Sequence, residues 1–289
     1  MSGDLTFKKI NAGVPAGERE ELLHFRRTHP LKRVIFAGTQ WEYIFCGRGD
    51  ETLLILPGLL GIAEMSFQHI LRFEDEYRVI VPNYPFHINS IAGLVEGIVR
   101  ILDEEGIRQA HILGGSYGGM IAQRLVRRYP ERVARLILSH TGGPEPERAH
   151  KNKRLVQILR FLPFSILRSM LKAATGKSMR DAPAQRPFWE DYTNEVLNWL
   201  CKPDIISRYE VAVDFDATSN FTSTDLQDWP GRILILEGDN DPIAGAGARA
   251  ALKTLHPQAR VHTFQETGHV ASIARVDEYV SVIKDFLKD

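Results

Sequence analysis

The sequence predicts an α/β protein built on a mostly parallel sheet that helices cover on both faces. Short runs that are apolar at nearly every position alternate with longer segments whose apolar residues recur at helical spacing. The alternation is interrupted only once, between about residues 142 and 230. Strands that are apolar on both faces are typical of parallel sheets enclosed between two layers of helices.

The order of elements supports one core formed by residues 31–142 and 231–289. Residues 1–30 are polar and are interpreted as an N-terminal arm with a short helix at 19–27. The runs 34–38 and 42–47 each end in glycine, and their spacing is typical of a β-hairpin. We expect strands at 34–38, 42–47, 52–56, 77–82, 110–113, 133–139, 232–236 and 260–264, and helices at 63–73, 88–106, 118–129, 245–255 and 270–287.

Residues 143–230, which interrupt the alternation, contain helix-like segments but no strand–helix repeat. We interpret them as a helical cap inserted between two strands of the core. The expected helices of this cap lie at 155–171, 187–200 and 204–214. The carboxyl ends of the parallel strands share one edge of such a sheet, and ligands bind outside that edge.

Composition narrows the function classes. Lys plus Arg and Asp plus Glu both total 36, so the net charge of zero favours neither nucleic acid nor a membrane surface. No apolar run approaches the roughly 20 residues of a membrane span, and residues 1–20 lack the apolar core of a signal peptide. Cys46 and Cys201 have no metal-site spacing and are interpreted as reduced cysteines of a cytoplasmic protein. We expect no cofactor and no metal.

The motif that carries chemistry is Gly-x-Ser-x-Gly, formed by Gly114, Ser116 and Gly118. It stands between the expected strand 110–113 and the helix 118–129, which is the context of a nucleophile elbow. In such an elbow the serine occupies a sharp, strained turn, and the flanking glycines let neighbouring backbone pass without a Cβ clash. The following helix directs free N–H groups at the reaction site. We therefore predict that Ser116 is a nucleophile.

A serine hydroxyl at neutral pH needs a base that accepts its proton. Of the ten histidines, His269 follows the last short strand and precedes the final helix, in a loop at the predicted catalytic edge. Gly268 gives this loop its conformational freedom. We predict that His269 is the base.

The histidine in turn needs a carboxylate that fixes its tautomer. After strand 232–236 the chain reads Glu-Gly-Asp-Asn-Asp-Pro, so three acids compete. Asp241 has left the strand and is the preferred candidate, whereas Asp239 is the alternative. The resulting chain order of serine, acid and histidine is the order that Ser-His-Asp hydrolases with this elbow use.

At this point the chain resembles the α/β-hydrolase superfamily over residues 30–289. The likeness rests on the elbow, on Gly238-x-x-Asp241, on Gly268-His269 and on the cap-sized insertion. It implies an α/β-hydrolase fold with an eight-stranded, mostly parallel sheet and a helical cap. It also implies hydrolysis through an acyl-enzyme on Ser116.

The resemblance further implies an oxyanion hole made of two backbone N–H groups. One belongs to Tyr117, and the other to Leu59, with Leu60 as the alternative. The candidate contacts to a small acyl substrate are Gly58, Leu60, His87 and His140.

Two departures from the common pattern affect the functional prediction. Pro57-Gly58 replaces the His-Gly of many relatives, and residues 82–87 (Pro-Asn-Tyr-Pro-Phe-His) replace an acidic, Gly-rich turn. Both features, with the polar N-terminal arm, are similar to the maspardin-like branch. That likeness implies an alternative function as a binding or scaffold protein with little activity.

A carboxylic ester is the expected substrate of the proposed triad. Alternatives with the same triad are thioester hydrolysis, carbon–carbon bond hydrolysis and a proline iminopeptidase activity, which the elbow Gly-Gly-Ser-Tyr-Gly-Gly resembles. A peptidase would need cap acids such as Glu190, Asp191 and Glu195 to hold a free amine. The serine at the elbow argues against dehalogenase and epoxide hydrolase activity, because enzymes of this fold with those activities have Asp at that position. The sequence makes no prediction of oligomeric state.

Overall fold

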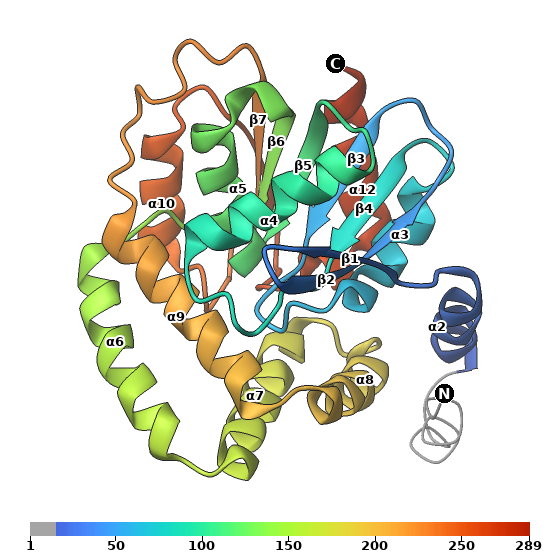
Figure 1. The fold of residues 1–289 in the computed structure, drawn as a ribbon. Helices are drawn as coiled ribbons and strands as arrows, with labels where there is room; N and C mark the ends of the chain where they lie inside the picture. The colour runs from blue at the N-terminus through green and yellow to red at the C-terminus, as the bar shows by residue number, and fades with distance from the viewer. Residues whose placement is uncertain (1–15) are drawn as a thin grey trace.

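The protein, described from residue 16 to residue 289 by a computed structural model, is built on one eight-stranded sheet (Figure 1). The strand order is β1-β2-β4-β3-β5-β6-β7-β8. Strand β2 runs antiparallel to both of its neighbours, and all other pairs are parallel. The predicted fold class is therefore confirmed. The strands are β1 (Lys32–Phe36), β2 (Thr39–Cys46), β3 (Thr52–Leu56), β4 (Arg78–Pro82), β5 (Ala110–Gly115), β6 (Val133–Ser139), β7 (Arg232–Gly238) and β8 (Arg260–Phe264).

Strands β1 and β2 form a hairpin at the edge of the sheet, joined by a two-residue turn. Ala37 and Gly38 connect β1 to β2 with φ values of 49° and 75°. Two-residue hairpin turns with positive φ match the right-handed twist of the flanking strands. Phe36 pairs with Thr39 directly beside this turn.

Two hydrophobic layers enclose the sheet. Alternate residues of β3 point to opposite faces, so Leu53 and Ile55 join one layer and Leu54 and Leu56 join the other. The first layer contains residues of α2 (Ala16–Thr28), α3 (Phe67–Phe73) and α12 (Val276–Lys288), and the second contains residues of α4 (Ile91–Glu104), α5 (Tyr117–Arg128) and α10 (Ala246–Leu255). Three short helical segments connect these elements: η1 (Ala63–Ser66), η2 (Pro130–Arg132) and α11 (Ala271–Ala274).

Four α-helices and one short turn lie between β6 and β7, within the predicted cap (residues 143–230). They are α6 (Pro146–Phe161), α7 (Phe164–Ser178), η3 (Met179–Asp181), α8 (Arg186–Trp199) and α9 (Lys202–Thr218). Figure 1 shows α7 and α8 below the sheet, on the side where the strand arrows end. Helices α7 and α8 therefore cover the edge at which ligands of parallel sheets bind.

Two helix predictions were wrong. The single helix expected at 155–171 is broken between α6 and α7, because Pro163 lacks an N–H and forces Leu162 into an extended conformation with ψ of 143°. The single helix expected at 270–287 is divided into α11 and α12 at Arg275, whose φ and ψ of −133° and 49° lie outside the helical region. Of the predicted N-terminal arm, residues 1–15 lie outside the described residues, and the rest forms α2.

An ion-pair cluster joins α2 to the core and to the cap. Arg26 of α2 donates to Glu64 at 2.7 Å and lies 3.1 Å from Glu195 of α8. Tyr192 of α8 also donates to Glu64, at 2.9 Å. Burial raises the pKa of Glu195, and the nearby Arg26 opposes this shift. One guanidinium thus pairs with both carboxylates and offsets the effect of burial on Glu195.

Replacing Arg26 by Met should destabilise the protein by about 3 kcal/mol, because it leaves the buried charge of Glu195 without this partner. Urea unfolding measures the effect. The double variant Arg26→Met/Glu195→Gln removes the second charge as well and should recover part of the loss. A double variant as unstable as the sum of both single variants would contradict this account.

Buried histidines make stability depend on pH. Burial lowers the pKa of His69 to about 4 and that of His256 to about 3. In the unfolded chain the pKa of histidine is about 6.5. Below that pH the unfolded chain binds protons that the folded protein does not, so the free energy of unfolding falls as the pH falls.

Each of these histidines should lower the free energy of unfolding by up to about 1.4 kcal/mol per pH unit between pH 6.5 and pH 4. Urea unfolding across this range measures the slope. His256→Phe keeps a ring in the site but cannot be protonated, so its slope should be shallower than that of the wild type. Equal slopes would show that His256 does not titrate as its burial requires.

Candidate active site

The predicted elbow forms the turn between β5 and α5. Ser116 has φ of 51° and ψ of −113°, a sparsely populated conformation for a residue with a side chain. A Cβ atom added to Gly118 would lie 2.1 Å from the carbonyl oxygen of Leu56, and one added to Gly114 would lie 2.6 Å from that of Gly118. Glycine is therefore required at both positions for the close packing of β3, β5 and α5.

Hydrogen bonds from the neighbouring strand hold the strained serine in place. The N–H of Ser116 donates to the carbonyl of Ser139 at 2.8 Å. The hydroxyl of Thr141 donates to the carbonyl of Ser116, also at 2.8 Å. Such strain costs of order 1–3 kcal/mol and persists only where the surroundings fix it. Sequence reasoning missed Thr141, which no motif marks.

The structure brings together the three residues of the predicted triad. His269 Nε2 lies 2.9 Å from Ser116 Oγ, and His269 Nδ1 lies 2.8 Å from Asp241 Oδ2. The three side chains come from loops after β5, β7 and β8, so the sheet topology aligns them along one edge. The geometry allows a proton to pass from the serine to a histidine that the carboxylate orients.

Asp241 and Asp239 have different surroundings. Asp241 Oδ1 accepts hydrogen bonds from the N–H groups of Ile243 and Ala244, at 2.8 and 2.9 Å. Burial would raise the pKa of Asp241, but the hydrogen bond from His269 and the two backbone donors lower it below its usual value. Asp239 Oδ1 instead accepts from the N–H of Thr267 at 3.1 Å and holds the loop that carries the histidine.

The two backbone groups predicted for an oxyanion hole lie beside the elbow. Tyr117 is the first residue of α5, so its N–H has no partner within the helix. Leu59 and Leu60 follow the end of β3 in a turn that the bond from Gly61 N–H to Gly58 carbonyl closes at 3.0 Å. Both leucines line the same cavity as Ser116, so the choice between their N–H groups stays open.

A cavity of about 400 Å³ opens onto Ser116 and His269. Its lining is mainly apolar and comes from both core and cap, which is typical of small-molecule sites. The cap contributes side chains of α7, Met179 and α8, including Leu171 and Trp189. No Lys, Arg, Asp or Glu is among the lining residues that the structure describes.

His140 and His87, both predicted substrate contacts, have different positions. His140 lines the cavity, is 4% exposed, and its Nδ1 lies 2.8 Å from the hydroxyl of Ser139. Its Nε2 is buried without a hydrogen-bond partner in the described residues. His87 instead is exposed, packs edge-on against Phe86 and lies outside the cavity lining, so we leave it out of the proposed site.

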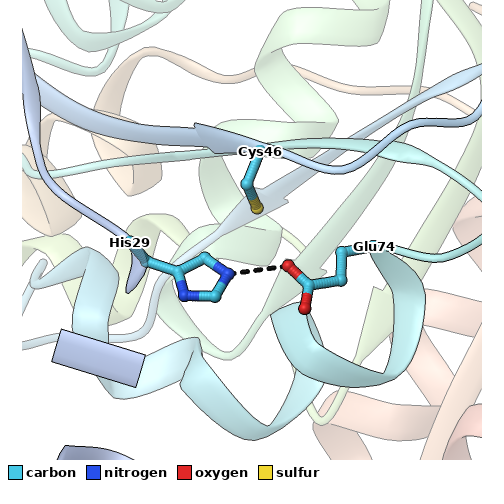
Figure 2. A group of neighbouring side chains, drawn as sticks. All are labelled: His29, Cys46 and Glu74. Carbon is cyan, nitrogen blue, oxygen red and sulfur yellow. Dashed lines mark hydrogen bonds and ion pairs between the residues drawn. The ribbon is translucent and has the colours of Figure 1, made fainter. Parts of the chain in front are cut away.

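One group of described residues, away from this cavity, could hold a metal ion. The ligand atoms of His29, Cys46 and Glu74 lie within 4.8 Å of one another (Figure 2). His29 Nε2 lies 2.7 Å from Glu74 Oε2. Burial, followed by the charge of Glu74, raises the pKa of the Cys46 thiol to about 12, so the sulfur keeps its proton. Cys46 pairs with Val79 near the start of β4, at the edge opposite to Ser116.

The sheet is mostly parallel and enclosed by helices, and a serine on a strand–helix turn faces a histidine and a carboxylate. This combination defines a hydrolase of the α/β class. Residues 51–275 match the family model of the alpha/beta hydrolase fold. The chain belongs to this family.

The chain is similar to several known hydrolases. It is 28% identical over 209 residues to 2-hydroxymuconate semialdehyde hydrolase of Pseudomonas putida, covering 69% of this chain and 70% of that protein. It is 26% identical over 264 residues to 2-hydroxy-6-oxononadienedioate/2-hydroxy-6-oxononatrienedioate hydrolase of Escherichia coli, covering 84% and 88%. A thermophilic esterase from Thermogutta terrifontis superposes with a TM-score of 0.73 at 18% identity over 90% of this chain and 98% of the esterase, a likeness of fold alone.

Proposed function

We propose that the chain is a serine hydrolase that cleaves a carboxylic ester through an acyl-enzyme. The observation that carries the proposal is the hydrogen-bonded series Ser116–His269–Asp241, which opens onto an apolar cavity. An idle serine would not need a strained backbone, a histidine within 2.9 Å and a carboxylate behind that histidine.

The proposed reaction has two steps. Ser116 Oγ forms a bond to the carbonyl carbon while His269 Nε2 accepts the hydroxyl proton. The N–H group of Tyr117 and that of Leu59, or of Leu60 as the alternative, donate to the oxyanion, and the bond to the leaving alcohol breaks as His269 returns the proton to its oxygen. Water then attacks the acyl-enzyme, His269 accepts its proton, and Ser116 recovers that proton as the acid leaves.

His140 fits a supporting role beside this triad. Burial, followed by the charge of His269, lowers the pKa of His140, so the ring is neutral. A neutral ring 5.9 Å from His269 adds no like charge against the imidazolium that forms during the reaction. Its unpartnered Nε2 can hydrogen-bond a polar atom of the substrate.

The chemistry of the cavity lining favours an uncharged substrate. Relatives whose printed names end in dioate act on molecules with two carboxylates. Such charges are costly to remove from water without a balancing cation, and the described lining holds neither Lys nor Arg. Its hydroxyls can donate hydrogen bonds but carry no charge, and burial lowers the pKa values of His69 and His140, so both rings are neutral.

The peptidase alternative lacks support because none of its cap acids, Glu190, Asp191 and Glu195, lines the cavity. Glu190 pairs with Arg186, and Glu195 pairs with Arg26.

Carbon–carbon bond hydrolysis is the second candidate, and the relatives favour it. It would use the same triad on a ketone, with the proton returned to carbon instead of oxygen. A panel of neutral p-nitrophenyl esters, matched esters with a terminal carboxylate, and vinylogous diketo acids separates the two. We expect turnover of the neutral esters, whereas faster turnover of the diketo acids would favour the second candidate.

Labelling with a fluorophosphonate probe, followed by peptide mapping, tests the shared chemistry. Label on Ser116 in the wild type, absent in His269→Ala, is the expected result. A folded wild-type protein that takes no label would overturn the proposal in favour of a binding protein, the function that the maspardin-like residues suggest.

A further inference from the structure

The net charge of zero conceals an uneven distribution. Helices α6 and α7 together carry eight Lys and Arg residues against one acid, Glu147. The rest of the chain therefore has a matching excess of acids. Arg148 and Arg160 pair with Asp216 and Glu210 of α9, but no ion pair connects the others to an acid in the described residues. The unpaired cations are Lys151, Lys153, Arg154, Arg168, Lys172 and Lys177.

The same two helices expose large apolar side chains. Phe161, at the corner between α6 and α7, is 89% exposed, and Ile158, Ile166 and Met170 are between 44% and 57% exposed. Helical spacing places Lys151, Arg154, Ile158 and Phe161 on one face of α6. It likewise places Ile166, Met170 and Lys177 on one face of α7. Each face therefore presents basic and apolar side chains together to the solvent.

The corner between these helices projects away from the sheet. Figure 1 shows α6 descending to the lower edge of the molecule, where the chain turns into α7. The proposed active site lies directly behind α7, because Leu171, Ala174 and Ser178 line the cavity of Ser116. An apolar ligand that comes from a surface touching α7 would have a short path to this cavity.

A basic hollow lies between α7 and α8, beside this cavity. Its volume is about 550 Å³, and Lys172, Lys177 and Arg180 contribute cations to its lining. Arg186 also lines it but pairs with the one acid there, Glu190, at 2.7 Å. Thr175 and Thr193 line both the hollow and the cavity of Ser116. An anionic headgroup in the hollow would therefore lie next to the proposed site.

From these observations we propose that the surface of α6 and α7 docks on an anionic lipid membrane. The exposed apolar side chains enter the interface, the unpaired cations attract acidic headgroups, and the hollow holds one such headgroup. No helix among residues 16–289 is both long and apolar enough to cross a bilayer, so the contact is peripheral. The proposal does not depend on catalysis, because binding alone defines it.

Co-sedimentation with vesicles tests the proposal. We expect the full chain to bind vesicles that contain phosphatidylglycerol, to bind pure phosphatidylcholine far less, and to dissociate as salt is added. The variant Lys151→Gln/Arg154→Gln/Lys177→Gln should bind about 100-fold less, because each surface cation contributes roughly fivefold. Phe161→Ser should bind about 10-fold less through lost apolar burial.

The control variant Arg100→Gln/Arg108→Gln/Arg128→Gln removes the same charge from exposed positions outside the cap and should bind normally. Equal losses in both triple variants, or no binding to acidic vesicles, would overturn the proposal. A third result would also overturn it. If light scattering showed that the wild type is a dimer, that Phe161→Ser is a monomer and that neither binds vesicles, the surface of α6 and α7 would bind a second copy of the chain. Repeating the assay with Ser116→Ala separates membrane binding from the proposed hydrolysis.

Discussion

Ser116→Ala should lower kcat for a cleaved ester by about a million-fold, the scale of loss when a serine protease loses its nucleophile. Among the described residues that line the cavity, no other hydroxyl has a histidine within 2.9 Å and a carboxylate behind that histidine. Thr28, His29 and Glu74 form a similar series, but they lie away from this cavity. The free energy of unfolding should not fall, because the substitution removes one hydroxyl from the cavity wall and deletes no packing contact of the core. Urea unfolding and single-turnover kinetics measure the two effects.

Loss of the base should have a nearly equal effect. His269→Ala should lower kcat about as much as Ser116→Ala, and the double variant should lower it no further, because the residues act as one unit. Ser178→Ala, which removes another hydroxyl from the cavity lining, is the matched control and should keep most of its activity. Additive losses would show that the serine and the histidine act independently and would contradict the proposed mechanism.

The sheet could be predicted because its strands are apolar on both faces and alternate with amphipathic helices. The arrangement of the cap was harder to predict, because four consecutive helices without strands between them can pack in several ways. Its break at Pro163 was nevertheless visible in the sequence, since proline and the residue before it both disfavour a helix interior. No comparable signal marks Arg275, where neither proline nor glycine divides α11 from α12.

The candidate site was predictable wherever backbone geometry demands a particular residue. Gly114 and Gly118 allow contacts that no side chain could, and they mark the position of Ser116. The cavity was not predictable, because its lining depends on how α7 and α8 pack over the sheet. His87 illustrates the limit, since it follows a strand end yet faces solvent.

Asp241→Asn should lower kcat by about 10,000-fold, as the equivalent change does in a serine protease. Asp241 Oδ1 accepts from two backbone N–H groups, and Oδ2 faces His269 Nδ1. If the asparagine oxygen keeps the two backbone donors, its amide donates to Nδ1. The proton of the imidazole then lies on Nε2, which can no longer accept the proton of Ser116. The opposite orientation of the amide would point its NH₂ group at two N–H donors.

Asp239→Asn is the matched control, because it makes the same change two residues earlier. Asp239 accepts from the N–H of Thr267, and an amide oxygen can accept that bond as well. We therefore expect kcat to stay within about threefold of the wild type, since a bond between neutral groups replaces one to a charged group. If Asp239→Asn instead lost activity and Asp241→Asn kept it, Asp239 would be the orienting acid. The loop that carries His269 would then have to move away from its contact with Asp241, which the 2.8 Å bond between them opposes.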